Sequence, residues 1–141
     1  MALEKLLQCP RNPNVMHTDG GTPLQAARAR HMAPMRLLLE AAAETDLRDT
    51  SPQGSTPLLL AASEGHVDCV DLLIQAGVDT DMATLDCGIA PLHRASLRGH
   101  LEVACLLIEG GADINKTTTD SGRTSLYLAA QEGTMSKLCA C

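Results

Sequence analysis

The sequence contains almost no aromatic residues. Its 141 residues include one Tyr and no Phe or Trp, so large rings are not available to anchor a broad globular core. The apolar residues are mainly Leu, Ala, Val, Ile and Met. Such aliphatic side chains suit many short helices that each bury a narrow stripe against a neighbour. The composition therefore favours a helical repeat.

Positive charge and long apolar runs are also scarce. The formal net charge is −6, so the chain has no basic face of the kind that a phosphate backbone attracts, and we expect no nucleic-acid partner. No apolar run approaches the roughly 18–20 residues of a membrane helix, and residues 1–9 are too short for a secretory signal. The sequence predicts a soluble, cytoplasmic protein with no membrane partner, and a nuclear location stays open.

The six cysteines include no C-x-x-C pair. Their scatter predicts neither a disulfide framework nor a zinc site, and a reducing compartment explains unpaired thiols most simply. Cys87, directly before Gly88 in a predicted loop, is the thiol that we expect to be accessible. A nucleophilic thiol would need a base within hydrogen-bond distance, which the sequence does not supply. We therefore predict no catalytic residue, no cofactor, no metal and no enzymatic activity.

A repeat of 34 residues dominates the sequence. Pro23, Pro57 and Pro91 recur at equal spacings of 34, with Ser125 in the fourth equivalent place. Self-similarity at a fixed period of this length is the signature of a stacked repeat architecture. A glycine lies three positions before each of these residues: Gly20, Gly54, Gly88 and Gly122.

Each unit is expected to hold two short helices. In the second unit, Thr56 can cap a helix that accepts Pro57 in its first turn, because the N–H that proline lacks has no intrahelical partner there. This helix should run to about Ser63 and end at Gly65, and a second helix is predicted over about 67–75. Helices this short are marginal alone in water, so each unit must bury its apolar faces against its neighbours.

The recurring form G-x-T-P-L-h-x-A-A-x-x-G-H, followed by V-x-L-L-I-x-x-G-A-D, resembles the ankyrin repeat, whose period is about 33 residues. The resemblance covers nearly the whole chain. It implies an all-α solenoid of stacked helix-turn-helix units with hairpin-like connecting loops. We expect one domain over 1–141, consisting of a partial repeat (1–19), three repeats (20–53, 54–87 and 88–121) and a truncated fourth repeat (122–141). The incomplete ends favour a fragment or isoform of a longer array.

The histidines invite an active-site interpretation, against which the repeat register argues. His66 and His100 each follow a glycine at the predicted turn between helices, and His93 completes the A-P-L-H form of the motif. The resemblance implies that histidines at these two positions are structural and hydrogen-bond across the turn and to the neighbouring repeat.

The resemblance also implies a non-catalytic protein-interaction module, a scaffold or adaptor that holds another protein of unknown identity. The partner would lie on a concave face made of loop tips and the outer side of the first helices. We expect a monomer or part of a longer repeat array. Ile89, Leu97 and Arg98 are the favoured contacts, because the scaffold requires no apolar residue at the first two positions and arginine is a frequent interface anchor. The candidate partner-binding residues are Gln53, Ser55, Ser63, Glu64, Cys87, Ile89, Leu97, Arg98, Ser121, Arg123, Gln131 and Glu132.

One alternative is more specific. Residues 6–49 also resemble the second repeat of the cyclin-dependent kinase inhibitors built from four ankyrin repeats, through Leu6-Leu7-Gln8, Arg36-Leu37-Leu38-Leu39 and Asp46-Leu47-Arg48-Asp49. The resemblance stops at Asp49, and repeats two and three look like ordinary ankyrin units. It implies a protein that binds a kinase and inhibits it, which a pull-down against cell-cycle kinases would test.

Overall fold

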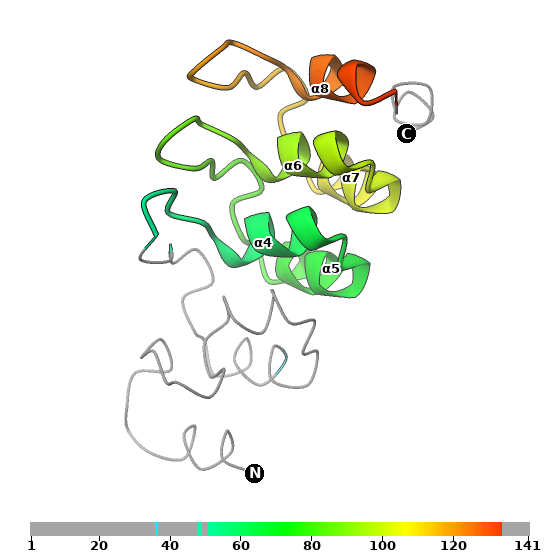
Figure 1. Cartoon of the computed structure of the whole chain (residues 1–141). Helices are drawn as coiled ribbons and strands as arrows, with labels where there is room; N and C mark the ends of the chain where they lie inside the picture. The colour runs from blue at the N-terminus through cyan, green and yellow to red at the C-terminus, as the bar shows by residue number, and fades with distance from the viewer. Residues whose placement is uncertain (1–35, 37–47, 49–50, 134–141) are drawn as a thin grey trace.

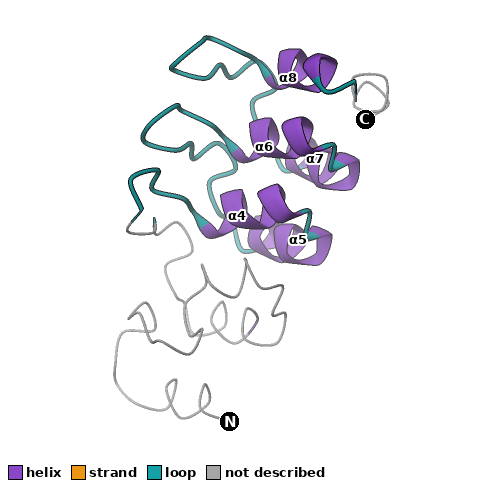
Figure 2. Ribbon diagram, in the orientation of Figure 1, coloured by secondary structure: helices purple, strands orange, loops and turns teal. Residues whose placement is uncertain are grey.

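The computed structural model describes residues 36, 48 and 51–133. Within this part the chain forms stacked layers of short helices, and the connecting loops all project to one side of the stack (Figures 1 and 2). The predicted partial repeat at 1–19 and nearly all of repeat one lie outside the described residues. The described part contains helices and no strand, so the expected all-α architecture is confirmed. The helices are α4 (Pro57–Glu64), α5 (Val67–Gln75), α6 (Pro91–Arg98), α7 (Leu101–Glu109) and α8 (Ser125–Gln131).

The first helix of each unit begins as the repeated motif predicts. The Oγ1 atom of Thr56 accepts a hydrogen bond from the N–H three residues later at 3.2 Å, and Thr124 does the same at the start of α8. Ala90 has no side-chain oxygen to offer at the equivalent place. Its own N–H instead donates to Nδ1 of His93 at 3.0 Å. Side-chain caps thus satisfy backbone groups that have no intrahelical partner.

A glycine in the left-handed conformation ends α4 and α6. Gly65 has a φ of 74° and Gly99 a φ of 72°. A Cβ atom on Gly65 would lie only 2.7 Å from Nδ1 of His100 in the next unit. The backbone conformation and the close approach of the neighbouring unit therefore both require glycine at this turn.

The core runs along the stack and consists of small aliphatic side chains. Leu73 of α5 and Leu107 of α7 are fully buried, and the helices pack both within each unit and against the next one. A small residue at one register position of the first helices allows those helices to approach closely. That position is a fully buried alanine in three successive units: Ala61, Ala95 and Ala129.

A threonine closes each connecting loop into a hairpin. The N–H of Thr84 donates to the carbonyl of Ile89 at 3.0 Å. In return, the Oγ1 atom of Thr84 accepts from the N–H of Ile89 at 3.0 Å. Thr118 and Arg123 repeat this pair of bonds at 2.9 and 3.1 Å. The predicted hairpin-like loops are confirmed, and the bonds fix where residues 89 and 123 lie.

One backbone hydrogen bond joins each hairpin to the next. The N–H of Leu85 donates to the carbonyl of Gln53 at 2.8 Å, and the N–H of Thr119 donates to the carbonyl of Cys87 at 2.9 Å. The two donors are 34 residues apart in the sequence, and so are the two acceptors, so the loops stack with the same period as the helices. The hairpin tips therefore form one continuous surface beside the first helices.

Candidate protein-binding surface

The structure places the predicted partner-binding residues at three levels of exposure. Ser55 and Ser63 are buried, with 9% and 8% of their surface exposed, and so offer a partner little contact. The half-buried residues are Cys87, Ile89 and Leu97. The exposed residues are Gln53, Glu64, Arg98, Ser121, Arg123, Gln131 and Glu132.

The face of α6 that carries Leu97 and Arg98 also carries Arg94. Residues separated by three and four positions lie on the same side of a helix. Arg94 is half-buried, and its Nε atom is buried without a hydrogen-bond partner in the part of the chain that the structure describes. The sequence does not single out Arg94 as a site residue. Its position in the repeat could have identified it, because the equivalent positions of the neighbouring units hold the apolar residues Leu60 and Leu128.

Charge alternates along the stack at the register position of Arg98. The preceding unit holds Glu64 there and the following unit holds Glu132, and all three side chains are exposed. The formal net charge of the chain is −6, so positive charge on this face is local. Arg94 and Arg98 concentrate that charge on α6, where a partner's carboxylate could meet it.

The hairpin position of Ile89 differs in chemistry from unit to unit. Ser55 stands there in the preceding unit and Arg123 in the following one. The hydrogen bonds to Thr84 and Thr118 use main-chain atoms of residues 89 and 123, so these bonds do not depend on which side chain stands at either position. Such a position can vary for recognition without loss of the bonds that close the hairpin.

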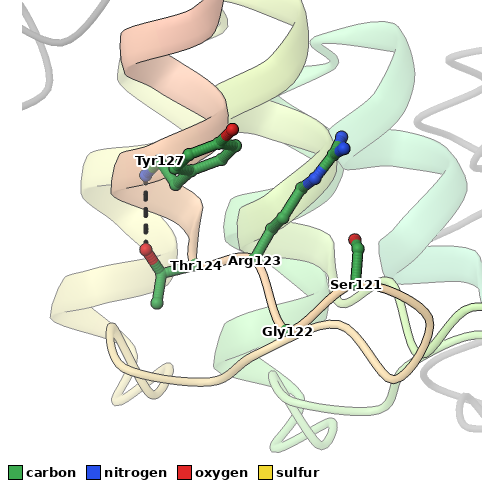
Figure 3. Close-up of a pocket in the computed structure, with 5 residues that line it drawn as sticks. All are labelled: Ser121, Gly122, Arg123, Thr124 and Tyr127. Carbon is green, nitrogen blue, oxygen red and sulfur yellow. Dashed lines mark hydrogen bonds between the residues drawn. The ribbon is translucent and has the colours of Figure 1, made fainter.

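The last described unit exposes an aromatic ring that the sequence-based site does not include. Tyr127 is 55% exposed, and Cζ of Arg123 lies 5.6 Å from the centroid of its ring. Figure 3 shows both side chains beside the turn that leads into α8. Together with residues 121, 122 and 124 they line a pocket of about 430 Å³. The register could have identified Tyr127, because it replaces the motif histidine found at His93.

The cysteines differ in state. Cys69 is buried, whereas Cys87 is half-buried and carries a free thiol. Partial burial, followed by the neighbouring carboxylate of Asp86, raises the pKa of the Cys87 thiol, which keeps it protonated and weakly nucleophilic. The expectation of unpaired thiols is wrong for Cys105, which is disulfide-bonded. No group of three His, Cys, Asp or Glu side chains among the described residues could hold a metal ion.

Two histidines hold the stack together as predicted. His93 is 1% exposed, and its Nε2 lies 2.8 Å from the carbonyl of Lys116. Because Nδ1 accepts the N–H of Ala90, Nε2 must carry the proton and donate it to that carbonyl. Nε2 of His100 lies 3.1 Å from the carbonyl of Ser63 in the preceding unit. Burial lowers the pKa of His93, which favours this neutral form.

No helix in the described part has the length and apolar character needed to cross a membrane.

Comparison with known proteins identifies the repeat. The family model of ankyrin repeats (three copies) matches residues 2–84 and 76–140. Human ankyrin repeat domain-containing protein 63 is 46% identical over 63 residues, which are 45% of this chain and 15% of that protein. Human neurogenic locus notch homolog protein 4 is 37% identical over 78 residues, or 55% of this chain and 4% of that protein. Ankyrin repeat and SOCS box protein 3 from Bos taurus is 35% identical over 86 residues, which are 60% of this chain and 16% of that protein. The chain spans less than a fifth of each of these relatives.

Proposed function

Because the chain belongs to the ankyrin-repeat family, we propose that it is a scaffold or adaptor that binds a partner protein through the concave face. Ankyrin repeats are generally non-catalytic protein-interaction modules. The proposed contact surface consists of the hairpin tips and the outer side of α6. Ile89, Leu97 and Arg98 are its centre, and Arg94 lies beside them.

The observation that carries this proposal is the half-buried Leu97 beside two arginines on one face of α6, with the half-buried Ile89 just before the helix. Ile89 and Leu97 still have surface to bury, and each lies where the repeat motif requires no apolar residue. The chemistry favours a partner that presents an apolar side chain and a carboxylate.

Affinity purification followed by mass spectrometry would identify the partner, and a triple variant would then test the surface. Ile89→Ala, Leu97→Ala and Arg98→Ala together should weaken the complex by more than about tenfold, because they remove both the apolar contacts and the charge. The melting temperature should hardly change, since none of the three side chains belongs to the buried core.

A matched control carries three substitutions on the second helices. Gln75→Ala, Glu102→Ala and Glu109→Ala change exposed residues of α5 and α7 and should leave the affinity unchanged. Equal affinities of the two triple variants would contradict the proposed surface. The search would then move to the hairpin tips at Gln53 and Arg123.

The kinase-inhibitor alternative rests on residues 6–49, of which the structure describes only 36 and 48. It therefore stays a prediction. Retention of a cell-cycle kinase in a pull-down with the full chain would favour it over a generic module.

A further inference from the structure

In two successive units, the hairpin of the following unit covers the backbone at the motif glycine, Gly54 in one unit and Gly88 in the next. Beside the carbonyl of Gln53, a Cβ atom on Gly54 would lie 2.7 Å from the side chain of Leu85. In the following unit, a Cβ atom on Gly88 would lie 2.6 Å from the side chain of Thr119. Each hairpin thus receives the turn of the next hairpin, which donates one N–H to its carbonyl and packs one side chain on its glycine.

The equivalent surface of the last described unit is open. The carbonyl of Ser121 accepts no hydrogen bond from any described residue. A Cβ atom on Gly122 would meet nothing within 4 Å. This is the place of the pocket of about 430 Å³ that Ser121, Gly122, Arg123, Thr124 and Tyr127 line (Figure 3).

The side chains around this open surface differ from those of the covered ones. Arg123 replaces Ile89, and its exposed guanidinium lies over the ring of Tyr127 without a hydrogen bond to any described residue. The nearby carboxylate of Asp120 is already engaged, because it accepts the hydroxyl of Ser121 at 3.0 Å. Hydrogen bonds from Thr118 and then Ser121 lower the pKa of Asp120, so it stays ionised beside those hydroxyls. Arg123 therefore has its charge available for a ligand.

We propose that this pocket binds a turn of a partner protein that carries an acidic side chain, an inference that rests on the proposed binding function. A backbone N–H of the segment donates to the carbonyl of Ser121, as Leu85 and Thr119 do in the covered units. One side chain packs over Gly122, and a carboxylate pairs with Arg123. The charge-assisted pair with Arg123 would supply affinity and select an acidic segment.

Panning a random heptapeptide library against the full chain tests the proposal. The enriched peptides should contain an excess of Asp or Glu at one position and lack proline at the position that donates to Ser121. Enrichment without an acidic preference, or no enrichment at all, would overturn the proposal.

A pair of glycine variants tests the place of binding. Gly122→Ala and Gly111→Ala both put a methyl group on a residue with positive φ, 63° and 93°, and neither methyl group meets a neighbour. The two changes should therefore lower the melting temperature to a similar extent. Only the methyl group on residue 122 enters the pocket, so Gly122→Ala should weaken peptide binding by at least tenfold while Gly111→Ala does not. Equal affinities would overturn the proposal.

Charge exchange tests the role of Arg123, because the side chain is exposed and its replacement leaves the backbone bonds to Thr118 in place. Arg123→Glu should weaken the acidic peptides by at least tenfold and strengthen versions in which Lys replaces the acidic residue. Unchanged binding of the acidic peptides would exclude the proposed ion pair.

Two further measurements distinguish this pocket from the concave-face surface and from a contact between copies of the chain. The Ile89, Leu97 and Arg98 triple variant should bind the peptides normally even if it loses the concave-face partner, so the two proposals can fail independently.

Sedimentation of the wild-type chain should show no self-association that Gly122→Ala abolishes. Such self-association would make a second copy of the chain the occupant and would overturn the acidic-segment proposal.

Discussion

His93 connects the protonation state of one side chain to the stability of the stack. Burial lowers its pKa below the ordinary value of 6.5, because the charged ring would lose its hydration, and this effect outweighs the hydrogen bond to the carbonyl of Lys116, which acts in the opposite direction. The unfolded chain therefore binds more protons than the folded chain as the pH falls below 6.5. The stability that His93 provides should be complete above about pH 6.5 and should be lost as the pH falls through the folded pKa. Thermal melts between about pH 8 and pH 5 would show this decline.

His93→Gln is the control, because its amide can form hydrogen bonds but does not titrate. The variant should melt at a lower temperature at neutral pH, and its melting temperature should decline less on acidification. The pKa values of Asp86 and Asp120 are also lowered, but their stabilising effect is lost only below their ordinary value of 3.8. An unchanged pH profile in His93→Gln would assign the decline to other groups.

Gly65 and Gly77 allow backbone strain to be separated from steric overlap. Both have positive φ, 74° and 82°, so alanine at either position should cost about 1–2 kcal/mol of unfolding free energy. At Gly77 the added methyl group meets nothing, whereas at Gly65 it meets the ring of His100. Gly65→Ala should therefore destabilise the chain more than Gly77→Ala in urea denaturation. Equal losses would show that the ring of His100 moves aside without cost.

At the scale of the element, the sequence predicted the helices well and the exposure of individual side chains less well. The bounds of α4 follow from local chemistry, a threonine cap and a glycine end, which the chain displays within a few residues. The burial of Ser63 depends on how closely neighbouring units approach, which no local pattern specifies. The exposure of Tyr127 depends on which parts of the chain lie over it in the folded structure. Its register equivalent, His93, is 1% exposed, whereas Tyr127 itself is 55% exposed.

Helix α8 should be the least protected of the described first helices. In the described part α6 packs against both α4 and α8, whereas α8 has α6 as its principal neighbour. Leu126 is 38% exposed, whereas its register equivalent Leu92 is 2% exposed. Amide hydrogen exchange should therefore be faster in α8 than in α6. Equal protection of the two helices would show that the end of the stack is covered in solution.

At the scale of the whole molecule, stability arises from contacts between units, because no helix of the described stack is long enough to be stable alone. Leu107 is fully buried in α7, which packs against both α5 and α6. Leu107→Ala should lower the free energy of unfolding by about 2–5 kcal/mol. Arg98→Ala on the exposed face should stay within about 0.5 kcal/mol of the wild type. Urea denaturation would measure both, and similar values for the two variants would contradict this assignment of the core.

The bond that joins one hairpin to the next involves only main-chain atoms. Substitutions at Gln53 or Cys87 leave the acceptor carbonyl in place, whereas proline at position 85 or 119 would remove the donor. This hydrogen bond is thus independent of the side chains at positions 53 and 87. A lineage could therefore acquire a new partner through single substitutions at the hairpin tips, with no compensating change elsewhere in the chain.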